Sequence, residues 1–231
     1  MSQVMSSSRP AIIIDMAAMR ERLRASRRIV RLAPELDGLE MLYRLSTDEE
    51  ALYAMPVLAW AIRGNGEVVG MVPWLNTLRP CHELDDPEHG CFVGYRDPET
   101  EELLDSPPTH KLQELEHAAA YFDYEPCEEG IALQLLPDTQ GTHALCYEED
   151  EGPWQLKQVH GWQLRSDGRI EALLLDESLP IQTPVLPGDD CLYAAEERHR
   201  TVYFFQRAIA NRIREQDPET LEALAMMVEI A

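Results

Sequence analysis

The sequence predicts an α+β protein in which antiparallel β-hairpins form one or two small sheets, with N-terminal, central and C-terminal helices. Two observations lead to this prediction. Apolar arms flank two turn sequences, Asn65-Gly66 and Asp167-Gly168, which are typical of β-hairpins. Elsewhere, apolar residues recur at intervals of three and four, as in helices that bury one face.

The N-terminal region, residues 1–33, is expected to form a Ser-rich tail and a basic amphipathic helix that runs from Asp15 to Arg31. Met16, Met19, Leu23 and Val30 fall near one face of this helix. The other face carries five arginines, Arg20, Arg24, Arg27, Arg28 and Arg31. Such a helix can bind phosphate, a membrane surface or an acidic partner. In so acidic a chain, we expect it to dock onto the acidic body or onto a second subunit.

Residues 34–231 are expected to form a single α+β domain. In its first part, the elements that we expect are a helix over 46–55 that starts with a capping box, a hairpin with arms 57–63 and 67–74, a loop over 76–90, a strand over 91–95 and a helix over 109–122. In its second part, we expect strands over 131–136 and 143–147, a hairpin with arms 154–165 and 169–176, a strand over 191–193, a helix over 198–215 and a final helix from 217.

The two hairpins resemble each other within the chain. Trp60, Arg63 and Gly66 are followed 102 positions later by Trp162, Arg165 and Gly168. One interpretation is a duplicated β-β-β-α unit, with pseudo-repeated halves at 46–128 and 129–231 and a ligand site in the cleft between them. The alternative is convergence, because hairpins with such turns are common.

Charge is spread unevenly over the 231 residues, whose formal net charge is −22. Residues 1–44 carry eight arginines and five acids, whereas residues 45–197 carry seven basic and 32 acidic side chains. This body should repel nucleic acid, so we expect no direct nucleic-acid binding by it. The charge predicts a protein partner with a basic surface, or self-association; the alternative is that the acidity serves solubility.

Neither a membrane span nor an export signal is predicted. The longest charge-free apolar run covers residues 51–62, whereas a span needs about 20 residues. We therefore expect a cytoplasmic protein, whose five cysteines are free thiols.

The segment from Cys81 to Cys91 contains residue types that bind zinc, and its candidate ligands are His82, His89 and Cys91. The spacing lacks a Cys-x2-Cys pair, so packing and loop roles are the favoured interpretation. Glu-x-x-His also occurs twice, at 114–117 and 196–199, but a di-metal site of this type needs a helix bundle that the strand-rich pattern does not provide.

No catalytic motif stands out, because the chain has no nucleophile elbow, Walker loop or dinucleotide fingerprint. Cys146 is followed by four acids, which oppose thiolate formation. We therefore expect a non-enzymatic acidic interaction protein, regulatory or accessory, that binds a basic partner surface. The alternative is a small-ligand-binding or metal-binding enzyme with a site between the two halves near the Cys81–Cys91 loop. We expect no cofactor, except zinc in the metal-binding alternative.

Overall fold

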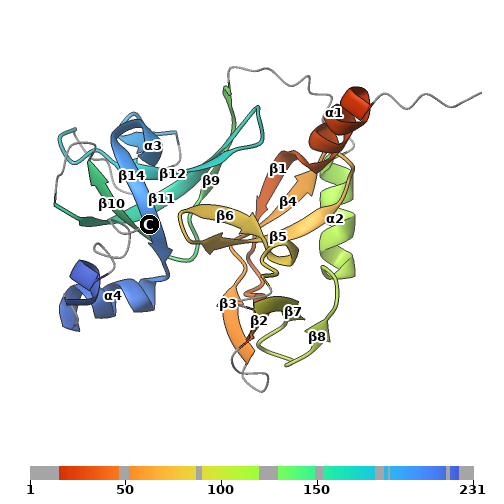
Figure 1. Cartoon of the computed structure of the whole chain (residues 1–231), viewed down its shortest axis with the longest axis horizontal. Coiled ribbons are helices and arrows are strands. Elements are labelled where there is room, and N and C mark those ends of the chain that lie inside the picture. The colour runs from red at the N-terminus through yellow and green to blue at the C-terminus, as the bar shows by residue number, and fades with distance from the viewer. Residues whose placement is uncertain are drawn as a thin grey trace, which may run out of the picture.

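The computed structural model describes residues 16–46, 52–86, 90–119, 130–148, 153–179, 185–186, 188–216 and 219–223. The chain is strand-rich with a few helices, and every strand pairing among these residues is antiparallel. The coarse prediction of an α+β protein built from antiparallel sheets is therefore confirmed. Figure 1 shows the first half, red to yellow-green, beside the second half, green to blue.

The first half consists of two four-stranded sheets and their flanking helices. One sheet has the strand order β1-β4-β5-β6 and the other β3-β2-β7-β8. The strands are β1 (Ile29–Pro34), β2 (Glu40–Leu45), β3 (Leu52–Pro56), β4 (Ala59–Arg63), β5 (Val68–Trp74), β6 (Thr77–Pro80), β7 (Gly90–Arg96) and β8 (Leu103–Leu104). The helices are α1 (Met16–Arg27), the short 3-10 helix η1 (Cys81–Glu83) and α2 (Thr109–Ala119).

The second half consists of one six-stranded sheet, in which β13-β12-β11-β10-β14 follow one another and β9 also pairs with β11. Its strands are β9 (Ala132–Pro137), β10 (His143–Glu148), β11 (Gln155–Arg165), β12 (Ile170–Leu175), β13 (Leu192–Ala194) and β14 (His199–Phe205). Its helices are α3 (Ala195–Arg198) and α4 (Arg207–Gln216).

The strand registers of the two halves correspond. Trp60 in β4 lies opposite Gly70 in β5, and Trp162 in β11 lies opposite Ala172 in β12, each 102 positions further along. β4 also pairs with β1 on its other side, as the same part of β11 pairs with β9. β2 lies between β3 and β7, and β10 lies between the first part of β11 and β14.

Buried apolar residues from both halves pack in a common core. Leu32, Leu58 and Met71 belong to one cluster with Trp162 and Leu174. A second cluster fills the space between the two sheets of the first half around Trp60, which is fully buried like Trp162. Burial of such large aromatic side chains contributes strongly to stability.

Three predicted helices are wrong in extent or in type. The N-terminal helix ends at Arg27, because the β-branched Ile29 and Val30 open a strand that pairs with β4. The helix predicted over 46–55 is in part strand β3, where pairing with β2 overrides the capping-box signal, while residues 47–51 lie outside the described residues. The helix predicted from 198 begins at Arg207, because the preceding residues form β14 against β10.

Both hairpins occur near their predicted positions, as β4–β5 and β11–β12, and a glycine with a left-handed backbone closes each turn. Gly66 and Gly168 have positive φ, 85° and 88°, and the N–H of each donates to the carbonyl three residues earlier. Three-residue loops closed by a left-handed glycine explain this pattern. The loop predicted over 76–90 contains β6 and η1, and the predicted central helix is described only to Ala119.

Candidate partner-binding groove

A hollow of about 580 Å3 lies on the first half, where the β7–β8 hairpin, the start of α2 and the segment before β2 meet. We call it the acidic groove. It is lined by Asp37, Leu39, Asp97, Glu102, Leu104, Pro108, Thr109, His110 and Gln113. Figure 1 places β8 and the adjacent turn at the end of the first half that lies away from α1.

Apolar side chains support the groove from below. Leu112 and Leu115 of α2 pack against the core cluster around Trp60, and this contact fixes the helix against the sheet. Leu39 is buried in the same cluster, and Leu104 packs against it. The groove therefore combines an apolar floor with polar walls, as partner-binding sites commonly do.

The wall on the Asp37 side is a chain of charged contacts. The ammonium group of Lys111 lies 3.0 Å from the Asp37 carboxylate and 4.0 Å from that of Glu35. Glu35 has no exposed side-chain surface and accepts the indole N–H of Trp60. Hydrogen bonds from Lys111, and then from His110, hold the pKa of Asp37 below its usual value, so Asp37 is negatively charged at neutral pH.

The opposite wall is the tight turn between β7 and β8, residues 97–102. The Asp97 carboxylate accepts the N–H of Glu99 at 2.8 Å, which with Thr100 lowers the pKa of Asp97. Glu101 has a left-handed backbone, φ 59°, which is uncommon for a residue other than glycine. Glu99, Glu101 and Glu102 are exposed, so this turn presents several carboxylates beside the groove.

Ion pairs within the protein involve most of the basic side chains of the acidic body. Of the seven basic residues within 45–197, five form ion pairs among the described residues, namely Arg63, Arg96, Lys111, Arg165 and Arg169. Arg63 contacts Glu67 at 3.1 Å and also Glu83 of η1.

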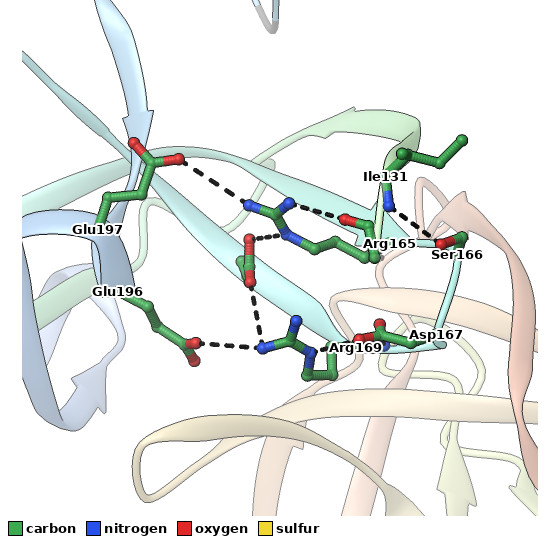
Figure 2. A network of polar contacts seen from close by, with 9 residues as sticks. Ile131, Arg165, Ser166, Asp167, Arg169, Glu196 and Glu197 are labelled. Carbon is green, nitrogen blue, oxygen red and sulfur yellow. Dashed lines mark hydrogen bonds and ion pairs between the residues drawn. The ribbon is translucent and has the colours of Figure 1, made fainter. Parts of the chain in front are cut away.

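The corresponding network in the second half is drawn in Figure 2. Arg165 lies 3.9 Å from Glu197, and Arg169 lies at the same distance from Glu196, so both arginines face α3. Both also contact the nearly buried Glu171. The positive charge of these arginines is thus balanced by carboxylates of the same chain.

The predicted basic helix is largely exposed. Met19 and Leu23 are 49% and 50% exposed, and Arg20 and Arg24 are exposed as well. The helix is held at its C-terminal end, where the carbonyl of Ser26 accepts the N–H of Asn65.

Two of the five arginines predicted to line this helix, Arg28 and Arg31, lie beyond its end. Arg28 instead lies against the turn of the second hairpin, where a methyl group on Gly168 would come within 2.4 Å of its Cγ. Its carbonyl accepts the N–H of Gly64 at 2.9 Å. Arg28 thus bridges the turns of both hairpins rather than extending the helical face.

The predicted zinc ligands are not brought together among the described residues. Cys91 lines a hollow of about 820 Å3 with Asp85 and Asp86, whereas His82 lines a different hollow of about 630 Å3 with Glu83 and Arg63. His89 lies outside the described residues. The part of the chain that the structure describes contains no group of three or more His, Cys, Asp or Glu side chains placed to hold a metal.

One titratable cluster in the second half has no counterpart in the sequence analysis. The Tyr193 hydroxyl lies 2.7 Å from Nε2 of His199, and the Arg198 guanidinium lies 4.3 Å from the centre of the Tyr193 ring. These residues line a hollow of about 490 Å3 with Asp176 and Lys157. Sequence spacing could not reveal it, because predicting a helix from 198 placed His199 on the wrong type of element.

The acidic groove was also absent from the sequence analysis. Its residues come from three segments that only the fold brings together, although the run Asp97 to Asp105 is visibly acidic. No family model matches the chain, and neither a curated protein nor a solved structure proved similar to it. None of the helices among the described residues is both long and apolar enough to cross a membrane.

Proposed function

We propose that this protein is a non-enzymatic interaction protein, regulatory or accessory, that binds a basic partner through the acidic groove, and that its two halves are copies of one duplicated unit. The observation that carries the functional part is the internal pairing of the body's basic side chains. Residues 45–197 carry 32 acidic and seven basic side chains, and five of these seven already form ion pairs among the described residues, so few of them are left to neutralise the acidic side chains.

The groove suits a basic amphipathic segment. The carboxylates of Asp37, Asp97 and Glu102 would attract lysine or arginine side chains, while Leu39 and Leu104 offer apolar contact. The electrostatic field of the negatively charged protein would raise the association rate with such a partner, and added salt would lower that rate by screening the charges. The buried Lys111 fixes Asp37 in place, which reduces the entropy that binding must overcome.

The corresponding registers support the duplication, and so do two matched side-chain contacts. Trp60 donates its indole N–H to Glu35, and Trp162 donates its own to Asp138 at 3.0 Å. In each half, the arginine three residues after the tryptophan contacts a glutamate of a one-turn helix, Glu83 of η1 before β7 or Glu197 of α3 before β14. The repeated unit is then a set of antiparallel strands in which the one-turn helix leads into the strand that pairs with β2 or β10, rather than the β-β-β-α unit predicted from sequence.

A peptide series tests the functional proposal. The probes are a synthetic amphipathic peptide of leucine and arginine, a scrambled peptide of the same composition, and a peptide with glutamate in place of arginine. Binding to the full chain is measured by fluorescence anisotropy. The groove variant is Glu99→Lys/Glu102→Lys/Asp105→Lys, which changes the lining residue Glu102 and two exposed acids within three positions of it. Glu177→Lys/Asp190→Lys/Glu215→Lys carries the same charge change on exposed residues elsewhere and serves as the control.

We expect the amphipathic arginine peptide to bind the native chain and the control, and to bind the groove variant about tenfold or more weakly, because like charges would face each other. Equal binding of the scrambled peptide, or an equal loss in the control variant, would show that net charge alone attracts peptides and that the groove has no role.

A small-ligand site is the second candidate, favoured by the hollow of about 820 Å3 beside the exposed Cys91. This hollow is lined by first-half residues, whereas the junction of the halves has a separate hollow of about 250 Å3 between Asn76 and the second half. Metal analysis of the purified protein tests the zinc version. Stoichiometric zinc that is lost in Cys91→Ser would support a zinc site there. Absence of metal from the native protein would contradict it.

A further inference from the structure

The helix α1 has the features of a ligand for the acidic groove. Its twelve residues include four arginines and one glutamate, and Met19 and Leu23 lie one helical turn apart on the same face. Both apolar side chains are about half exposed. Isolated helices of about 12 residues are marginal in water, so such a helix gains stability from packing its apolar face against another surface.

The arginines of α1 lie beside this apolar pair, and the groove likewise combines apolar side chains with carboxylates. Arg20 and Arg22 neighbour the stripe on its two sides, and all four arginines of α1 are exposed. The groove is lined by Leu39, Leu104 and Pro108 together with the carboxylates of Asp37, Asp97 and Glu102. Charge and apolar contact are therefore complementary between two surfaces of the same chain.

The chain's own α1 is fixed away from its own groove. Its C-terminal end is bound to the first hairpin turn by the Asn65 N–H to Ser26 carbonyl bond, at 3.0 Å, and by the Gly64 N–H to Arg28 carbonyl bond. Figure 1 places α1 and β8 at opposite ends of the first half. An intramolecular contact would require these bonds to break.

We infer that α1 of one copy docks into the acidic groove of a second copy, so that two chains form a twofold dimer with two equivalent helix-in-groove contacts. An isologous pair satisfies both surfaces at once. This inference rests on the proposed function, because it names the basic partner of that groove as a second copy of this chain. A different basic protein would then have to displace α1.

Charge reversal on each surface tests the dimer. The helix variant is Arg20→Glu/Arg22→Glu/Arg24→Glu, and the groove variant is Glu99→Lys/Glu102→Lys/Asp105→Lys. The control is Arg44→Glu/Arg79→Glu/Arg200→Glu, which changes three exposed arginines outside α1. Circular dichroism first verifies that each variant is folded, and light scattering after gel filtration then gives the mass in solution.

We expect the native chain and the control to have twice the 26.3 kDa of one chain, and each reversed variant to have the mass of one chain. An equimolar mixture of the two reversed variants should regain the dimer mass, because each helix then meets a groove of opposite sign. Raising salt should weaken the native dimer about tenfold or more, since exposed charges are screened.

A native chain that remains monomeric overturns the inference, and so does a mixture of reversed variants that remains monomeric. The designed peptides separate this failure from failure of the proposed function. If they bind the groove of a monomeric chain, the groove takes a different basic partner. If neither peptides nor a second copy bind there, both proposals fail.

Discussion

Leu32 and Gln134 join the two halves through a pair of hydrogen bonds. The backbone N–H of Leu32 donates to the Gln134 side-chain carbonyl at 2.9 Å, and the Gln134 amide donates back to the Leu32 carbonyl at 2.6 Å. Leu32 is 1% exposed, so water does not replace these bonds easily. At the junction of β1 and β9, the Gln134 side-chain amide thus forms the two backbone hydrogen bonds that a neighbouring strand would otherwise form with Leu32.

Substitution Gln134→Ala should therefore lower the free energy of unfolding by about 1–3 kcal/mol, because it leaves buried backbone groups of Leu32 without partners. Urea denaturation followed by tryptophan fluorescence measures this loss. The control is Gln158→Ala at an exposed position of β11, where we expect a change within about 0.5 kcal/mol. Equal effects of the two substitutions would contradict the structural role of Gln134.

The two buried tryptophans should respond alike to loss of their indole N–H. Trp60→Phe removes the hydrogen bond that the indole N–H donates to the Glu35 carboxylate, and Trp162→Phe removes the one donated to the Asp138 carboxylate. Bonds to charged groups contribute about 1.5–3 kcal/mol, and the smaller ring adds a packing loss. Thermal unfolding should show a large loss for both and a smaller one for Trp154→Phe, which is half-buried. If only one of the two buried positions is sensitive, the halves are not energetically equivalent.

Asp176 should titrate far below an ordinary aspartate. Hydrogen bonds from the Ser178 hydroxyl, and then from Arg198, lower its pKa from 3.8 to about 2. Because the folded pKa is depressed, the resulting stabilisation is complete above about pH 4 and is lost as the pH falls toward 2. Carbon-detected NMR titration measures the pKa directly, and Ser178→Ala should raise it. An unchanged pKa in that variant would exclude the hydroxyl as the main cause.

The described cysteines should differ in reactivity. Cys81 is fully buried, and burial raises the pKa of its thiol to about 12, whereas Cys91 is exposed. Since the thiolate is the reactive form, iodoacetamide should alkylate Cys91 in the native protein and Cys81 only after unfolding. Peptide mass spectrometry locates the adducts. Rapid labelling of Cys81 under native conditions would contradict its burial.

The parts of the fold that local chemistry dictates were predictable from the sequence. Both long hairpins were found because Gly66 and Gly168 mark the left-handed position of a turn. β14 was missed because the spacing of Val202, Phe205 and Ile209 also fits a helix, and short apolar segments do not distinguish the two types by periodicity alone. The segment that became β3 was misassigned because its pairing with β2 is a tertiary effect.

The candidate site was less predictable than the fold. The charge of the body predicts a basic partner, and the sequence also predicts an interaction surface of five arginines, of which Arg20, Arg24 and Arg27 lie in α1. The groove itself depends on contacts between the segments that contain Asp37, Glu102 and Thr109, which lie far apart in the sequence. Only the packing of α2 on the first half brings their side chains to one hollow.

The most direct test of the central claim is to locate where a basic segment binds. Backbone amide resonances of the full chain are followed by NMR while the synthetic arginine-leucine peptide is added. We expect shifts at Leu39, Glu102, Leu104 and Thr109, which are lost in the groove variant. Shifts confined to the hollow around Tyr193 and His199, or spread over all acidic surfaces without saturation, would contradict it.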